Sequence, residues 1–304
     1  MKAFREKHIM SRIRIVLLTI IVLFGMAGNS LLTRAVLGEH LIGPLPFTTI
    51  RLTSGAIILL VLIAATRTRP KLHHVLMPFM LFLYALAFAY GYEHLGAATG
   101  TLFLFFAIQA TMLAWEIRGG RRLSKLQWTG SGLTLVGLWV LVGGISDVPK
   151  LLGIGLMLGA GTAWAAYSIL GKASSDDLAT TTANFIYSGF AAIIFLAIYA
   201  VAEHWHHEVV HITIKGIYYS MIIGAITSAL IYVLWYILIK ELAGVTSAVI
   251  QMLVPLIVVL SSAPLLGEKI TIRILLAGSA MIFGILLVTL PQENKKVFSN
   301  KSGR

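Results

Sequence analysis

Long apolar runs separated by short polar breaks occupy almost the whole chain. Ten of these runs are long enough to cross a membrane as helices, which takes about 20 mostly apolar residues each. They are too long and continuous for barrel strands, and a backbone in lipid must satisfy its own hydrogen bonds, so helices are predicted. The predicted spans cover residues 15–36, 47–65, 75–93, 97–116, 127–145, 152–171, 183–202, 216–238, 244–265 and 273–290.

The composition agrees with this pattern. Hydrophobic residues make up 58% of the chain and charged residues 12%, and the mean hydropathy is +0.89, all outside the range of soluble domains. The basic segment 2–14 also resembles the start of a secretory signal. No clear small-residue cleavage site follows it and nine further spans do, so we interpret it as part of a retained first helix. The predicted fold class is an all-α integral membrane protein with ten transmembrane helices.

Lysines and arginines are distributed unevenly between the two sides of the predicted bundle. With the amino terminus inside, the inner segments hold 18 of the 24 Lys and Arg residues, whereas the outer side holds Arg34, Lys150, Lys215, Lys269 and Arg273. Positively charged loops stay in the cytoplasm, so both termini are predicted to be cytoplasmic. The net charge of +12 then complements anionic lipid headgroups and requires no nucleic-acid partner.

The chain also matches itself at an offset of about half its length. LGAAT at 95–99 aligns with LAGVT at 242–246, and the same ungapped register pairs Gly120 with Gly267. At a smaller offset, SLLTRA at 30–35 aligns with SILGKA at 168–173. We therefore predict two five-helix repeats, 1–146 and 147–291, followed by a cytoplasmic tail, 292–304. Five is odd, so the repeats are inverted, as in many secondary transporters, whose substrate site lies near the midplane between the halves.

These features resemble the EamA type of the drug/metabolite transporter superfamily over essentially the whole chain. The most specific segment is LAGVTSA at 242–248, which leads through Pro255 to Gly267 and Glu268; Arg51 in the second span adds to the likeness. The family places a proline in both the fourth and ninth spans, but here the fourth has Ile108 opposite Pro255. The resemblance implies a ten-helix carrier of the bacterial inner membrane that moves small metabolites, commonly outward.

One segment matches a catalytic signature. HWHHEVVHIT at 204–213 contains the zinc-protease pattern H-E-x-x-H at His207, Glu208 and His211, which needs a helix and a third ligand. The β-branched residues here favour extended chain, and the next acid, Glu241, follows another span and so lies on the opposite face. We interpret the segment as an outer connection and expect no metal, no cofactor, no catalytic residue and no enzymatic activity. A zinc-dependent hydrolase, an adventitious metal site and pH-sensitive gating are the alternatives.

Other catalytic arrangements are missing from the sequence. It has no cysteine and no phosphate-binding glycine loop, which excludes disulfides and disfavours ATP-driven pumping. No span has an acid near its middle. Adjacent Asp176 and Asp177 are predicted to form a solvated turn or to cap the seventh span.

Polar and aromatic residues inside the spans are the candidates for function, because such groups should face the bundle interior or a wet cavity. Interhelical hydrogen bonding and core packing are the alternative roles for them. Pro255 is the predicted gating residue, since its missing N–H allows a hinge one turn earlier. Arg51 is expected to be buried with a partner in a structural role rather than to contact the substrate, either by snorkelling or by binding a helix-end carbonyl. Tyr236 is expected to anchor at the interface. The predicted substrate-binding residues are Asn29, Tyr84, Phe88, Gln109, Trp164, Tyr167, Trp235 and Gln251.

The sequence as a whole predicts a secondary transporter. We expect an exporter of small metabolites, such as amino acids or related organic solutes, that works by alternating access. A flippase for lipids or lipid carriers is the second hypothesis, and the zinc hydrolase is the third. The expected partners are a small-molecule substrate and the lipid bilayer, with the chain acting as a monomer. The substrate, the coupling ion and the direction of transport are left open.

Overall fold

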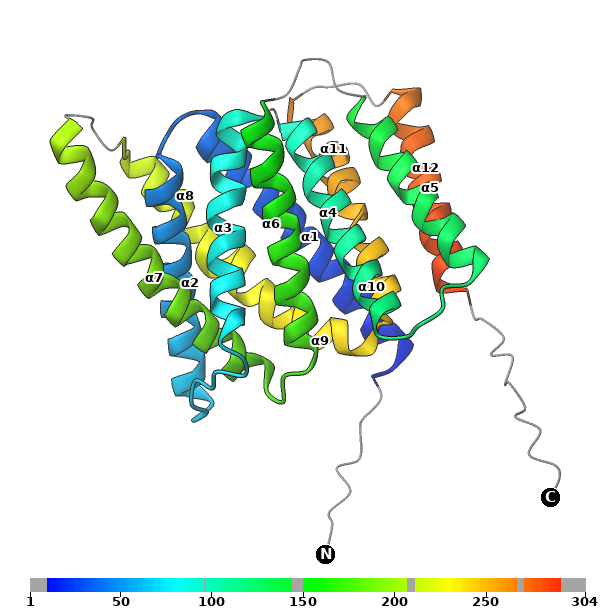
Figure 1. The fold of residues 1–304 in the computed structure, drawn as a ribbon, viewed down its shortest axis with the longest axis horizontal. Coiled ribbons are helices and arrows are strands. Elements are labelled where there is room, and N and C mark those ends of the chain that lie inside the picture. The colour runs from blue at the N-terminus through cyan, green and yellow to red at the C-terminus, as the bar shows by residue number, and fades with distance from the viewer. Residues whose placement is uncertain (1–9, 96, 144–149, 207–210, 267–270, 291–304) are drawn as a thin grey trace, which may run out of the picture.

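The computed structural model describes residues 10–95, 97–143, 150–206, 211–266 and 271–290, and nearly all of them are helical. Figure 1 shows the helices packed side by side. α8, η1 and α9 form one crossing, Ile214–Glu241, and α10 and α11 together form another. The elements are α1 (Arg12–Gly38), α2 (Pro44–Ala65), α3 (Leu76–His94), α4 (Ala97–Arg118), α5 (Lys125–Val142), α6 (Leu151–Lys172), α7 (Asp177–His206), α8 (Ile214–Ile222), the π-helix η1 (Ile223–Leu230), α9 (Ile231–Glu241), α10 (Gly244–Ile250), α11 (Leu253–Leu266) and α12 (Ile272–Thr289).

The ten predicted crossings are therefore confirmed as helices. Within the described ranges, nine crossings are long and apolar enough to span a membrane. The tenth is α5, an 18-residue helix that opens with the polar Lys125 and Gln127. Large apolar side chains on the outer surfaces, such as Phe24, Phe79 and Phe190, are more than half exposed, as expected of residues that face lipid.

Most of the extensive helix contacts join one crossing from each half of the chain. α5 packs against α12 and α2 against α7, while α6 contacts both α3 and α4. α1 makes the corresponding contacts with the α8–η1–α9 crossing and with α11. The start of α1 and the end of α12 lie on the same side of the bundle (Figure 1), as an even number of crossings requires. The repeat boundaries at 146 and 147 remain a prediction.

The α7–α8 connection contains the H-E-x-x-H segment. Residues 204–206 end α7, whereas 207–210 lie outside the described residues. The chain then runs extended, with Ile212 bridged to Ile42, and the Gly43 N–H donates to the His211 carbonyl at 2.9 Å. Thr213 caps α8 by accepting from the Gly216 N–H at 3.0 Å. The extended conformation predicted from the β-branched residues is thus confirmed for 211–213.

On the opposite side of the bundle, Asp176 caps α7 as predicted. Its carboxylate accepts from the Ala179 N–H at 3.0 Å. Asp177 forms an ion pair with Lys240 of α9 and accepts from the Ser174 hydroxyl at 3.0 Å. This side of α7 is therefore tied to α9.

Candidate functional site

The ninth crossing breaks in the middle of the bundle. α10 ends at Ile250 and α11 begins at Leu253, one turn before Pro255. Because Pro255 has no N–H, the carbonyl of Gln251 cannot receive the usual helical bond; it accepts from the Val254 N–H at 3.0 Å instead. The break lies where the proline predicts it.

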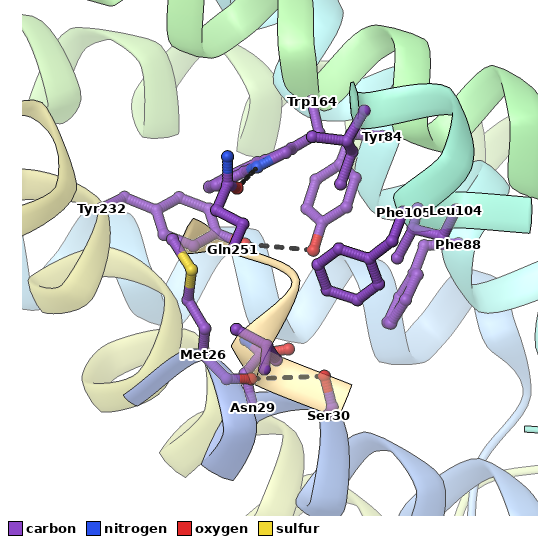
Figure 2. Close-up of a pocket in the computed structure, with 12 residues that line it drawn as sticks. Met26, Asn29, Ser30, Tyr84, Phe88, Leu104, Phe105, Trp164, Tyr232 and Gln251 are labelled. Atoms are coloured by element: carbon purple, nitrogen blue, oxygen red, sulfur yellow. Dashed lines mark hydrogen bonds between the residues drawn. The ribbon is translucent and has the colours of Figure 1, made fainter. Parts of the chain in front are cut away.

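A small cavity lies beside this break (Figure 2). Its volume is about 40 Å³, enough for about three water molecules. Side chains from α1, α3, α4, α6, α9 and the α10–α11 break surround it, which places it at the meeting point of the two predicted repeats. It is lined by Met26, Asn29, Ser30, Tyr84, Phe88, Leu104, Phe105, Ile108, Trp164, Tyr232, Gln251 and Val254.

Trp164 and Gln251 join α6 to the broken crossing. The Trp164 Nε1–H donates to Gln251 Oε1 at 2.7 Å, and Gln251 Nε2 donates to the Ser247 carbonyl at 2.9 Å. The ring of Trp164 lies 5.0 Å from that of Tyr84 and 4.7 Å from that of Tyr232. One wall of the cavity is thus aromatic, with faces suited to a planar group or a cation.

Behind the tyrosines lies a buried arginine. Arg51, about two turns into α2, is 1% exposed. Its Nε donates to the Ser228 hydroxyl at 2.8 Å and its Nη2 to the Tyr232 hydroxyl at 2.8 Å. The predicted burial of Arg51 with a partner is therefore confirmed, but the partners are interior side chains and not a helix-end carbonyl.

The π-helix η1 supplies part of this polar cluster. Asn29 Nδ2 donates to the Ser228 hydroxyl at 2.9 Å and to the Thr227 carbonyl at 3.3 Å. Both acceptors belong to η1, and π-helical turns occur frequently at functional sites. η1 packs closely on α2, because a Cβ on Gly224 would lie 2.1 Å from the Arg51 carbonyl oxygen. The cluster therefore links α1, α2 and η1.

The structure brings some predicted site residues together and separates others. Asn29, Tyr84, Phe88, Trp164 and Gln251 line the cavity. Two predicted residues, Trp235 and Tyr167, are fully buried beside it without lining it. The Trp235 Nε1–H donates to the Ser168 hydroxyl at 2.9 Å, and the Tyr167 ring lies 5.8 Å from that of Trp164.

Two further residues have structural partners elsewhere. Gln109 Nε2 donates to the Ser131 carbonyl at 2.9 Å and its Oε1 accepts from Thr134 at 3.4 Å, so it ties α4 to α5. Tyr236 is fully buried and donates to the Tyr167 carbonyl at 3.1 Å, so the prediction that it anchors at the interface is wrong.

Tyr232 is the main lining residue that the sequence analysis did not select. It lies one turn before Trp235 and one turn after Ser228 on a single crossing. Its hydroxyl accepts from Arg51 and donates to the Tyr84 hydroxyl over 3.4 Å. The available signal was the spacing of Ser228 and Tyr232, four residues apart, which places two polar side chains on the same face of a spanning helix.

The cavity adjoins a second space of about 240 Å³ on the side where α1 ends and α12 begins. The two spaces share Ser30, Phe105 and Val254, and the larger one also reaches Pro255 and Arg273. A third space, about 460 Å³, lies towards the other side and is lined in part by His73, Glu116 and Lys172.

Several contacts separate the central cavity from this third space. Besides the Trp164–Gln251 bond, Lys172 Nζ donates to the Leu242 carbonyl at 2.6 Å, and the Asp177–Lys240 ion pair joins α7 to α9. The central cavity thus shares lining residues with the second space, whereas these contacts lie between it and the third space.

Comparison with known proteins identifies the family. The model of the EamA-like transporter family matches residues 151–290. An uncharacterized protein of Pseudomonas aeruginosa is 37% identical over 282 residues, which is 92% of this chain and 96% of the relative. This chain belongs to the EamA-like transporter family. It is accordingly an EamA-type protein of the drug/metabolite transporter superfamily, an integral membrane protein that acts on a small molecule in a lipid environment.

A relative with a named activity and a solved structure with a similar fold were also found. The threonine/homoserine exporter RhtA of Escherichia coli K12 is 28% identical over 256 residues, 82% of this EamA-type chain and 83% of RhtA. A solved crystal structure superposes on this chain with a TM-score of 0.73 at 17% sequence identity. The match covers 92% of this chain and 98% of the other. The second likeness concerns the fold alone.

Proposed function

We propose that this EamA-type protein exports amino acids or related small organic solutes by alternating access at the central cavity. The observation that carries the proposal is the cavity itself: an aromatic wall with amide and hydroxyl groups, set at a helix break between the predicted repeats. Its likeness to a threonine/homoserine exporter supports small amino acids as the first substrates to try. Family membership supports a transporter without enzymatic activity.

The contacts around the cavity suggest how access would alternate. Opening towards the third space requires separation of Trp164 from Gln251 and of Lys172 from the Leu242 carbonyl. Both pairs join α6 to the region around the broken crossing. A hinge at Gln251–Pro255 allows α10 to move while α11 stays in place, which is the kind of gate that broken helices provide in inverted-repeat carriers.

Counterflow in proteoliposomes tests the proposed function. Vesicles containing purified protein and loaded with unlabelled L-threonine should accumulate labelled L-threonine or L-homoserine faster than empty vesicles. A parallel panel of amines and nucleosides defines the substrate range. If amino acids produce no counterflow while another class does, the amino-acid proposal is wrong and the responding class replaces it.

We further propose that the protein lies in the bacterial inner membrane with both termini in the cytoplasm. The excess of positive charge on one side supports this orientation. Reporter fusions after Arg122 and at the carboxyl terminus should report a cytoplasmic location, and a fusion at His206 should report the outside. Opposite locations for the two ends would contradict the topology.

A further inference from the structure

We propose that the central cavity binds a carboxylate group of its substrate and that Arg51 supplies the positive charge for it. This inference rests on the proposed function and narrows it to substrates that carry a carboxylate. It begins from an arginine that is buried in the membrane region and has no anionic partner among the described residues.

Arg51 is removed from water and forms no ion pair with any acid that the structure describes. The ion pairs among the described residues are Arg121–Glu116, Lys215–Glu39 and Lys240–Asp177, and these acids lie near helix ends. Arg51 donates to two neutral hydroxyls, those of Ser228 and Tyr232, and its Nη1 has no hydrogen-bond acceptor among the described residues. A guanidinium has five N–H donors and favours bidentate binding of carboxylates, so the Nη1 donors of Arg51 remain available for an anion.

A single layer of side chains, formed by Tyr84 and Tyr232, separates the positive charge of Arg51 from the cavity. The Arg51 guanidinium carbon is 5.6 Å from the centre of the Tyr84 ring, and its Nη2 donates to the hydroxyl of Tyr232. Both tyrosines line the cavity. Their mutual hydrogen bond is long, 3.4 Å between oxygens, and therefore weak. A carboxylate in the cavity could replace Tyr84 as the acceptor of the Tyr232 proton and meet the field of Arg51 directly behind it.

The opposite wall suits the other end of an amino acid. Figure 2 shows Tyr232 on one side of the cavity and the rings of Phe88 and Phe105 on the other, and aromatic faces attract ammonium groups. A zwitterion would thus place its carboxylate at Tyr232 and its ammonium group at Phe88 and Phe105. The cavity would have to widen, because its present volume is that of a few waters.

A purely structural role for Arg51 makes a different prediction. A buried charge without a counter-ion is costly in a membrane interior, and apolar replacement of buried charged groups is often neutral or stabilising. If Arg51 is retained for a ligand, removing its charge should preserve or raise thermal stability and impair binding. If Arg51 holds the helices together, removal should lower stability.

The experiment compares L-threonine with L-threoninamide, which keeps the ammonium group and side chain but lacks the negative charge. On the purified full chain in detergent, calorimetric titration should show L-threonine binding roughly tenfold or more tightly than the amide, as expected for a charge-assisted hydrogen bond. In Arg51→Met this ratio should fall to about one, with an unfolding temperature at least equal to that of the wild type. Arg118→Met, which removes an exposed arginine at the end of α4, is the matched control and should keep the ratio.

The outcomes separate this inference from the proposed function. If Arg51→Met keeps the ratio, or loses stability and binds both compounds equally less well, Arg51 does not recognise the carboxylate. If Arg51→Met fails to fold, Arg51→Lys decides: a ratio about fivefold below that of the wild type supports the inference, and an unchanged ratio overturns it. If the wild type neither binds nor transports amino acids, the proposed function fails and the carboxylate assignment fails with it.

Discussion

The fourth and ninth crossings hold equivalent places in the predicted repeat but differ in shape. α4 is one helix of 22 residues, whereas the ninth crossing is divided into α10 and α11 at Gln251 and Met252. The repeat alignment pairs Ile108 of α4 with Pro255 of α11. One residue therefore accounts for the difference: Ile108 keeps its N–H and continues the helix, while Pro255 has none to donate.

The third and eighth crossings also differ in regularity, here through a π-helix and not through a break. α3 is regular, but its counterpart contains the π-helix η1 between α8 and α9. Both irregular crossings belong to the second half, and both contact the Arg51 cluster or the cavity. The irregular helices at the central site therefore come from the second half, and their counterparts in the first half are uninterrupted α-helices. Gating should therefore be asymmetric between the halves.

Putting a proline into α4 is the strongest test of this asymmetry. We expect Ile108→Pro to lower the free energy of unfolding by about 3 kcal/mol or more, because the ring removes a hydrogen bond from a continuous helix and collides with the preceding turn. Ile108→Val, which keeps the helix, should cost about 1 kcal/mol. Thermal unfolding in detergent measures both. Equal stability of the proline variant and the wild type would show that α4 breaks as readily as its counterpart.

The contact between α4 and α6 tests whether the uninterrupted α4 is rigidly packed. A Cβ on Gly161 would lie 2.3 Å from the Leu104 carbonyl oxygen, whereas one on Gly159 would meet nothing within 4 Å. Gly161→Ala should therefore destabilise the protein by about 1–3 kcal/mol. Gly159→Ala, the matched control, should be neutral or slightly stabilising because alanine favours the helix. Similar unfolding temperatures for the two variants would contradict tight packing here.

Substrate affinity tests whether the two halves share the site. Trp164→Ala and Gln251→Ala should each weaken binding of a transported amino acid roughly tenfold, because each removes one partner of a buried contact at the cavity. Tyr218→Ala should leave affinity unchanged, since this side chain is 62% exposed on α8. Titration of folded variants decides the matter. Wild-type affinity in both cavity variants would mean that these residues pack together without touching the substrate.

Repairing the break should affect movement more than binding. Pro255→Ala restores an N–H that can donate to the Gln251 carbonyl, so α10 and α11 should become more nearly continuous. We expect slower counterflow, with the dissociation constant within about twofold of the wild type. Comparing initial rates with titrations separates the two effects. An unchanged rate would remove Pro255 from the gate.

The H-E-x-x-H segment should show the smallest effect. Glu208→Gln keeps the shape of the side chain but removes a general base. We expect transport and thermal stability to remain close to those of the wild type, because the described residues on either side of the segment, at the end of α7 and before α8, do not line the cavity. A large loss of activity in a folded variant would revive the hydrolase hypothesis.

Much of the site could be predicted from the sequence, for identifiable reasons. A polar or aromatic side chain in mid-span has few acceptable positions, so Asn29, Trp164 and Gln251 were expected in the interior and line the cavity. The same criterion selected Gln109, which hydrogen-bonds to α5 instead. Residue type predicted burial in both cases, but not which neighbouring helix would receive the side chain.

The sequence by itself determined the ten crossings, the break in the ninth crossing and the family. Long apolar runs and a proline act on the local backbone, and the segment at 242–248 can be recognised by alignment. Only the tertiary structure decided that the Arg51 side chain points inward and donates a hydrogen bond to Ser228 of η1. It also decided that Tyr232, a second acceptor for Arg51, lines the cavity. Those contacts join residues more than 170 positions apart. They depend on how α2 packs against η1, which no local pattern specifies.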